Sequence, residues 1–187
     1  FLTGCVNQHP KDSKKSSQGE SVETMLEITD PKEKQAVLNA KAKVKALSGN
    51  PRIVATSPAV ADICDKLDLD LVGVPKSSVS KIPSRYKKVK KVGLAMSPDM
   101  EIVSSLNPDW ILAPSSLETD LKPKFEELKN TEYAFLNLRS VQGMYRSAQE
   151  LGEIFGKQQE AEKMTKEFTT FYKSYTKRNK NKKHPKV

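Results

Sequence analysis

The sequence contains few of the residues from which enzymes build active sites, with two histidines and two cysteines among 187 residues. His9 and His184 stand near opposite ends of the chain, which argues against a Ser-His-Asp or Cys-His catalytic set and against a zinc site made by the protein. A P-loop, a nucleotide-binding glycine triad and a cysteine pair at metal-binding spacing are also missing from the sequence. We therefore expect a protein that is not an enzyme.

Long hydrophobic runs are missing too, and none approaches the roughly 20 residues that span a bilayer. A membrane contact would instead go through Cys5, because Phe1-Leu-Thr-Gly-Cys5 resembles the end of a bacterial lipoprotein signal, in which the cysteine is lipidated. The alternative is that Cys5 is an ordinary thiol. We expect a lipid anchor on the extracellular face of the cytoplasmic membrane. Cys64 occupies an apolar helical position, so no disulfide framework is predicted.

Acidic residues are absent from two segments, residues 76–98 and 173–187, each of which carries seven positive residues. These segments account for most of the net charge of +9. Neither has aromatic residues interleaved as in a stacking platform, and no nucleic-acid motif is present, so no nucleic-acid partner is expected. A solvated basic face near an anionic cell surface is the expected arrangement.

The first 51 residues are predicted to lie outside the compact domain. Residues 6–24 are rich in Ser, Lys, Gln and Gly and cannot bury enough surface to fold, so residues 6–51 are predicted to be a polar tether with one helix. Asp30-Pro-Lys-Glu33 supplies the N-cap and first turn of that helix, and Val37, Val44 and Leu47 follow at helical spacing. Its apolar stripe is thin, so the helix is either marginal or packs against something absent from this sequence.

Strand and helix patterns alternate from Arg52 onward, which predicts an α/β fold with a Rossmann-like lobe and a mostly parallel sheet over residues 52–156. A long basic loop at 76–91 is expected to cover Tyr86. A long helix over 157–181 is predicted to connect this lobe to a second one, which would begin at 182–187. The expected strands are 53–57, 71–74, 110–113 and 133–138, and the expected helices are 58–67, 99–107, 117–128, 140–155 and 158–178.

The helix that starts at Ser140 is predicted from a long apolar stripe. The stripe keeps the helical period for four turns, and Gly156 ends it. Its expected inward residues are Val141, Met144, Tyr145, Ala148, Leu151, Gly152 and Phe155.

Two features of the lobe suggest a ligand. The N–H groups of Ala59 and Val60 would be free at the start of the first helix, an arrangement that suits carboxylate or phosphate. Met96 lies in a loop between the basic stretch and a helix capped by Asp99, where it is either a core residue or a sulfur that contacts a ligand.

Four segments carry a resemblance to a known family: Arg52–Pro58 (RIVATSP), Leu71–Pro75 (LVGVP), Gly93–Val103 (GLAMSPDMEIV) and Leu106–Leu112 (LNPDWIL). They resemble the N-terminal lobe of the iron-complex and cobalamin substrate-binding proteins of ABC importers. Within that class they are most similar to the heme-receptor lipoproteins of Gram-positive iron-regulated surface systems. The resemblance covers residues 52–187 and implies two α/β lobes, joined by one long helix, that grip the ligand between them.

The resemblance also implies residue roles. Met96 falls at the position of the axial heme ligand of the first lobe, and a histidine of the second lobe would be its partner. The propionates of heme b (iron-protoporphyrin IX) would meet Ala59 and Val60 with help from Ser77 or Ser78, although the loop length leaves the choice between Ser77, Ser78 and Val79 open. Core packing remains the alternative for Met96.

The expected partners follow from the same resemblance. Glu101 matches the acid that docks on arginines of the ABC permease, and its alternative role is to complement the helix dipole. Upstream surface heme-transfer proteins are a further class of partner. Two rival functions remain open: a siderophore- or cobalamin-binding lipoprotein of the same transporter class, and a surface module that holds anionic wall polymers through the basic segments.

Overall fold

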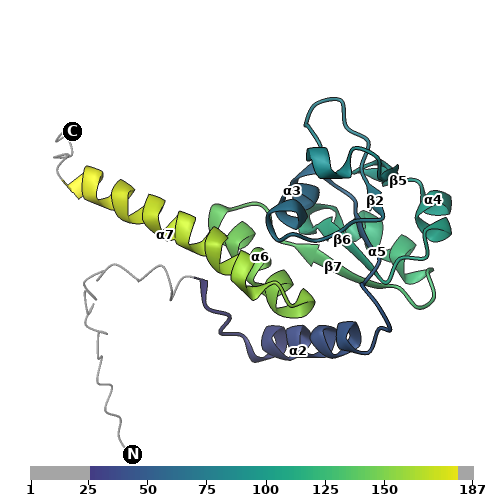
Figure 1. The fold of residues 1–187 in the computed structure, drawn as a ribbon, viewed down its shortest axis with the longest axis horizontal. Helices are drawn as coiled ribbons and strands as arrows, with labels where there is room; N and C mark the ends of the chain where they lie inside the picture. Colours follow the sequence, from purple (N-terminus) through teal and green to yellow (C-terminus); the bar gives the residue numbers. More distant parts are fainter. Residues whose placement is uncertain (1–25, 181–187) are drawn as a thin grey trace, which may run out of the picture.

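The protein is built around a five-stranded sheet in which all the neighbouring strands are parallel, in the order β3-β2-β1-β6-β7 (Figure 1). The structure is a computed structural model and describes residues 26–180. The predicted α/β lobe with a mostly parallel sheet is confirmed. The strands are β1 (Ile53–Ala55), β2 (Gly73–Val74), β3 (Lys90–Lys91), β6 (Trp110–Pro114) and β7 (Glu132–Leu136).

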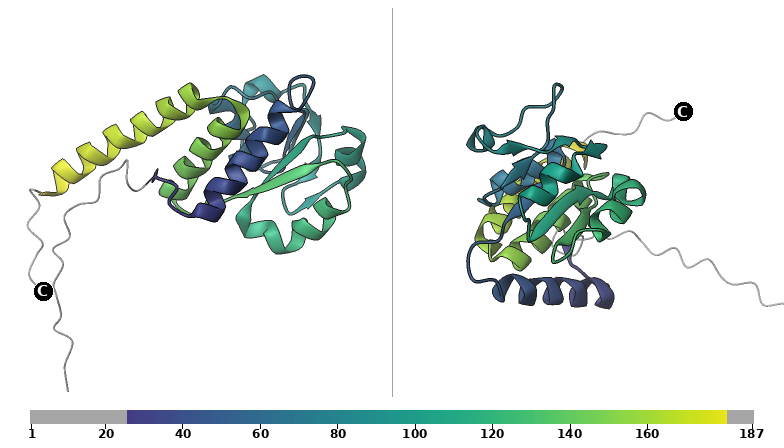
Figure 2. Two further views of the ribbon diagram at one scale, coloured as in Figure 1. Left: turned by 90° about the horizontal axis from the view of Figure 1, so that it is seen from below. Right: turned by 90° about the vertical axis from the view of Figure 1, so that its right-hand side faces the viewer.

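The central strands are apolar on both faces because helices cover both (Figures 1 and 2). Ile53 and Ala55 of β1 point into one core, and Val54 between them points into the other, as the alternation of a strand requires. One core packs under α3 (Pro58–Lys66), α6 (Val141–Phe155) and α7 (Gln158–Lys180), and the other packs under α4 (Met100–Ser105) and α5 (Glu118–Glu126).

The basic segment differs from the expected loop. It contains a short 3-10 helix (Ser84–Tyr86) and the edge strand β3, so the sheet has one strand more than the four predicted. Both residues of β3 are exposed lysines, which gave no apolar signal in the sequence; charged residues are common on exposed edge strands. Tyr86 is buried as predicted, and its hydroxyl donates to the Leu69 carbonyl oxygen at 2.5 Å.

The helix starts agree with the sequence in detail. Asp30, Ser57, Asp99 and Ser140 each accept hydrogen bonds from the first-turn backbone of the helix that follows. One inward assignment is wrong: Val141 is exposed, because it occupies the first position of α6, ahead of the turns that reach the core.

Helix α2 (Pro31–Lys45) lies against α6 and is part of the lobe's helical layer, although the sequence placed it in a tether (Figure 2). Val37 is buried in the contact. Lys41 forms an ion pair with Glu153 of α6, and Lys43 reaches Glu132 of β7 at 2.7 Å. The thin apolar stripe is therefore supplemented by cross-helix ion pairs.

Helix α7 runs for 23 residues, about 34 Å at 1.5 Å per residue, and its second half extends beyond the lobe (Figure 1). Its first half packs on α6, where Gly152 allows close approach: a Cβ there would lie 2.7 Å from the Ala161 Cβ. Phe171 and Tyr175 are exposed in the second half. Among residues 26–180, no helix is long and apolar enough to cross a membrane.

Candidate functional site at the carboxyl edge of the sheet

The predicted ligand residues gather at one edge because the strands are parallel and all end on the same side. Ala59 follows β1, Ser77 and Ser78 follow β2, and Met96 follows β3. A direct link joins two of these segments, since the Lys76 N–H donates to the Gly93 carbonyl oxygen at 2.7 Å. The structure therefore places the loop after β2 beside the loop that carries Met96.

Met96 lies at the tip of a tight hairpin formed by β4 (Gly93–Leu94) and β5 (Ser97–Pro98). Its side chain is 74% exposed, so the core-packing alternative is wrong. Gly93 has φ +100°, and a Cβ there would lie 3.0 Å from the Asp99 backbone nitrogen. The glycine thus permits the sharp turn that holds the Met96 sulfur away from the core.

The serine loop after β2 is partly organised by its own side chains. The Ser77 hydroxyl oxygen accepts from the Ser80 N–H at 3.0 Å, which closes a local turn. Ser77 is half-buried, whereas Ser78 is exposed. Ser78 is thus the more accessible of the two hydroxyls.

The start of α3 differs from the expectation at one residue. The Val60 N–H is not free, because it donates to the Ser57 hydroxyl oxygen at 3.2 Å, and the Val60 side chain is buried. The N-cap serine has taken the position that an anion would need. Ala59 is exposed at the same helix end.

Two further exposed apolar side chains lie in the loops at this edge; the sequence offered Val79 only as an alternative to Ser77 and Ser78, and it did not single out Leu94. Val79 is 94% exposed and Leu94 is 56% exposed, and both lie in the loops at this edge. The available signal was an apolar residue inside a polar loop. Together with Met96, they form the carboxyl-edge apolar group (Val79, Leu94, Met96), a surface suited to a flat apolar ligand.

The basic segment 76–91 carries lysines that have no ion-pair partner among the described residues. Six of them, from Lys76 to Lys91, are exposed and form no ion pair with any residue in the range 26–180. The six are Lys76, Lys81, Lys87, Lys88, Lys90 and Lys91.

Arg85 in the same segment behaves differently. It contacts Asp68 at 2.9 Å and Asp70 at 3.0 Å, so its charge is neutralised and it fastens the segment to the lobe. The hydrogen bond from Arg85 lowers the pKa of Asp68, with Lys157 assisting. The unpaired positive charge therefore belongs to the lysines.

Glu101 lies in the first turn of α4, directly after the hairpin, and its side chain is exposed. Its carboxylate has no ion-pair partner in the part of the chain that the structure describes. The backbone N–H of Glu101 donates to the Asp99 side chain at 3.1 Å, so the Asp99 cap fixes the position of the Glu101 backbone in the first turn of α4. An accessible, unpaired acid at this place suits a contact with a cationic partner.

Of the cysteines and histidines in the sequence, only Cys64 lies among the described residues. Cys5, His9 and His184 lie outside the described residues. Cys64 is buried in α3, and burial raises the pKa of its thiol to about 12. No group of three or more His, Cys, Asp or Glu residues within 26–180 could hold a metal ion, so Met96 would act as a single ligand from this lobe.

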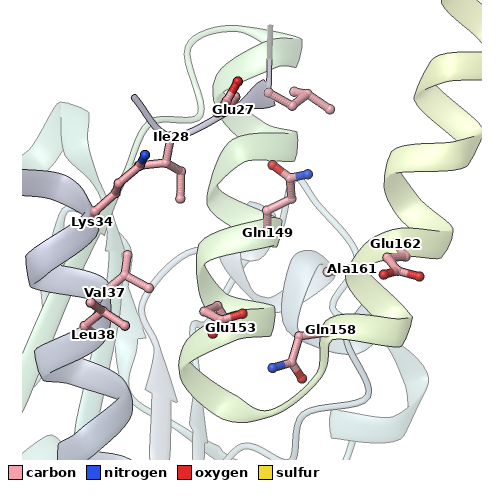
Figure 3. A pocket seen from close by; sticks show the side chains of 11 residues that line it. Glu27, Ile28, Lys34, Val37, Leu38, Gln149, Glu153, Gln158, Ala161 and Glu162 are labelled. Carbon is pink, nitrogen blue, oxygen red and sulfur yellow. The ribbon is translucent and has the colours of Figure 1, made fainter. Parts of the chain in front are cut away.

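A cavity of about 750 Å³ lies elsewhere, between α2, α6 and α7 (Figure 3). Val37 and Leu38 of α2 form one wall, Gln149 and Glu153 of α6 face it, and Ala161 of α7 lies at the far side. The carboxyl edge is by contrast an open face. It resembles one half of a cleft.

Comparison with protein families gives a match to the periplasmic binding protein family over residues 53–187. The high-affinity heme uptake system protein IsdE of Staphylococcus aureus is 36% identical over 141 residues, which is 75% of this chain and 48% of IsdE. The chain thus spans about half the length of the curated relatives it matches.

Solved structures give the same picture. An ABC transporter substrate-binding protein from Listeria monocytogenes matches with a TM-score of 0.69 and 42% identity, over 73% of this chain and 52% of that one. S. aureus IsdE complexed with heme matches with a TM-score of 0.67 and 31% identity, over the same shares. The resemblance seen in the sequence is confirmed at the level of the family.

Proposed function

The chain belongs to the periplasmic binding protein family, and on that premise we propose that it is the first lobe of a receptor that carries heme to an ABC permease. Membership in this family of substrate carriers confirms the prediction that the protein is not an enzyme. The proposed class of cargo is an iron complex, and the proposed cargo within that class is heme. It is supported by similarity to a heme uptake protein.

The observation that carries the heme proposal is the exposure of the Met96 sulfur. A thioether is a soft, neutral ligand that suits heme iron, particularly opposite a histidine. A methionine that is 74% exposed contributes little to the packing of the lobe itself. It suits a lobe whose open face closes over a porphyrin, with Val79 and Leu94 against the apolar macrocycle.

The heme propionates are assigned to the polar side of the same edge. Hydrogen-bond donors are offered by Ser77 and Ser78 and by the exposed N-terminal turn of α3 at Ala59. Lys76 directly precedes the two serines in the loop after β2. Val60 contributes only packing at this helix end, because its N–H already donates to the Ser57 hydroxyl oxygen and is not available to a propionate. The six lysines raise the local potential and attract an anionic porphyrin.

Docking on the permease is assigned to Glu101, whose exposed carboxylate would meet arginines of the membrane subunit. Anchoring on the extracellular face of the membrane is assigned to a lipid on Cys5. Upstream surface proteins would supply the heme. Helix α7 would lead into the second lobe, which would contribute the histidine.

The decisive test substitutes the sulfur while preserving its shape. Full-length protein is titrated with hemin, and the Soret band is compared for wild type, Met96→Leu and Met100→Leu. Met100 is the matched control because it begins α4 and packs toward the core. We expect Met96→Leu to change the spectrum and weaken hemin binding by at least about tenfold, and Met100→Leu to change neither.

Two results would redirect the proposal. An unaltered Soret band in Met96→Leu would remove the axial role. Absence of a Soret shift in wild type, together with binding of a ferric siderophore or cobalamin, would keep the transporter role and change the cargo.

A second candidate function rests on the six unpaired lysines, which could hold an anionic wall polymer. Sedimentation of the protein with purified cell walls at increasing salt tests it. Binding that is salt-sensitive and unaffected by Met96→Leu would support this second role. Loss of wall binding in a Lys87→Gln, Lys88→Gln, Lys90→Gln, Lys91→Gln variant would assign it to the basic segment.

A further inference from the structure

The proposed function does not use the cavity between α2, α6 and α7. The cavity is bounded by Val37 and Leu38 of α2, by Gln149 of α6 and by Ala161 of α7, and none of the candidate heme-binding residues lines it (Figure 3). Its volume of about 750 Å³ falls in the range of small-molecule binding sites. The cavity is therefore a candidate site for a second ligand, separate from the carboxyl edge.

Contacts on two sides hold the cavity open. Glu33 in the first turn of α2 contacts Arg146 of α6 at 3.0 Å. Leu26, which precedes α2, is 1% exposed and packs against Phe168 of α7. The segment that contains α2 is thus tied to α6 and to α7 at separate points, and it leaves a preformed space between these helices.

Apolar side chains contribute to several walls of this space. Ile28 lines it from the segment before α2, Val37 and Leu38 line it from α2, and Ala161 lines it from α7. Leu38 is 55% exposed, although the neighbouring Val37 is buried. An apolar side chain that stays accessible inside a concave surface offers contact area to the hydrocarbon part of a ligand.

The charged side chains at the cavity do not balance. Glu27, Lys34 and Glu162 line it and form no ion pair with any residue from 26 to 180, whereas Glu153 is paired with Lys41. Two unpaired carboxylates and one unpaired ammonium leave an excess of negative charge. Lys34 belongs to the α2 wall and Glu162 to the opposite α7 wall (Figure 3). A cationic group of a ligand is therefore favoured on the α7 side.

We propose that this cavity binds a single-chain amphiphile with an ammonium head group. The hydrocarbon chain lies against Ile28, Val37 and Leu38, and the head group meets the carboxylates of Glu162 and Glu27. The ligand is distinct from the iron complex assigned to the carboxyl edge. Its binding does not depend on which cargo that edge carries.

The experiment compares three amphiphiles on the whole chain with Cys5→Ser, so that no anchor lipid competes for the cavity. Dodecylamine is titrated below its critical micelle concentration by isothermal titration calorimetry, in parallel with dodecanoate and decylamine. Dodecanoate keeps the chain length and reverses the charge, and decylamine keeps the charge and shortens the chain. We expect saturable binding of dodecylamine, with both of the other compounds binding roughly tenfold more weakly.

Leu38→Gln tests the apolar wall without removing a buried side chain. We expect it to weaken dodecylamine binding by roughly threefold to tenfold, because the hydrocarbon chain loses an apolar contact. The matched control is Leu94→Gln, which removes a leucine of nearly equal exposure, 56%, from the carboxyl edge and should leave dodecylamine binding unchanged. Equal losses in the two variants would mean that the amphiphile binds any exposed apolar surface, and would overturn the proposal.

Glu162→Gln tests the contact with the head group. It should weaken dodecylamine binding several-fold and reduce the preference for dodecylamine over dodecanoate. The matched control is Glu167→Gln, which removes the same charge from an exposed position on the same helix that does not line the cavity. This control should change neither quantity.

Two results in the parent chain would overturn the proposal: absence of saturable dodecylamine binding, or equal or tighter binding of dodecanoate. Near-UV circular dichroism of Trp110 in β6 verifies that the lobe is folded in each variant. A hemin titration of Leu38→Gln separates this site from the carboxyl edge, because we expect its Soret response to equal that of the parent. A changed response would contradict the independence of the two sites.

Discussion

The carboxyl edge of the sheet and the helical flank of α2, α6 and α7 use the same residue types in opposite ways. On the flank, Lys41 and Lys43 are paired with carboxylates, and Leu151 is 1% exposed. At the edge, Lys76 forms no ion pair with any described residue, and Leu94 is 56% exposed. On the flank, charged and apolar side chains hold helices together, whereas at the carboxyl edge they are left uncovered.

This contrast separates structural residues from candidate ligand residues. A single exposed leucine is ordinary, but Val79, Leu94 and Met96 at one sheet edge form a group, and grouped exposed apolar side chains mark contact sites. The flank needs no outside partner to satisfy its ion pairs. Under the proposed function, a ligand or another part of the protein would cover the edge.

Truncating a leucine in each region should give the largest difference. We expect Leu151→Ala to lower the free energy of unfolding by about 2–5 kcal/mol, since it leaves a cavity under α6. Leu94→Ala should change the free energy of unfolding by no more than about 0.5 kcal/mol, because more than half of Leu94 is already exposed to solvent. Urea unfolding monitored by circular dichroism measures both. Equal losses would show that Leu94 is part of the core.

The hairpin glycine tests whether the edge depends on geometry. Gly93→Ala should cost about 1–2 kcal/mol, because a Cβ at φ +100° is strained and close to the Asp99 nitrogen. Hemin affinity should fall as well, since Met96 is displaced although its sulfur remains. Gly49→Ala is the control, because a Cβ at Gly49 would meet no heavy atom within 4 Å and its φ is not positive. A stable Gly93→Ala with unchanged hemin binding would contradict the assigned role of the turn.

Removing one lysine from each region should have the smallest effect on stability and the clearest difference in kind. Lys41→Gln should cost about 0.5–1 kcal/mol by breaking the partly exposed pair with Glu153. Lys76→Gln should leave stability unchanged but slow hemin association at low salt. Stopped-flow rates at two salt concentrations measure the second effect. An association rate independent of salt would rule out steering by these lysines.

Much of the fold was predictable because its signals are local. Apolar runs bounded by Pro, Gly or Ser marked the strands at Ile53 and Trp110, and Ser57, Asp99 and Ser140 marked the helix starts. The strand β3 was missed because two lysines at a sheet edge carry no burial signal. This strand forms by pairing with β2, and a local sequence pattern carries no information about that pairing.

The sequence named candidate ligand residues, but it did not determine whether they are exposed. The sequence pointed to Met96, Ser77 and Glu101, yet it left open whether the sulfur was buried. It also expected a free N–H at Val60, which the side chain of Ser57 occupies. Leu94 was overlooked, and Val79 was considered only as an alternative to the two serines, because an apolar residue in a loop is informative only once its neighbours in space are known.

The sequence by itself determined the alternating α/β pattern, the helix caps and the absence of catalytic residue sets, because each depends on residues a few positions apart. The tertiary structure alone decided that the Met96 sulfur is open to solvent and that Arg146 of α6 pairs with Glu33 of α2. Those facts depend on which segments meet in space, and two residues on helices so far apart along the chain have no local pattern that would predict their contact.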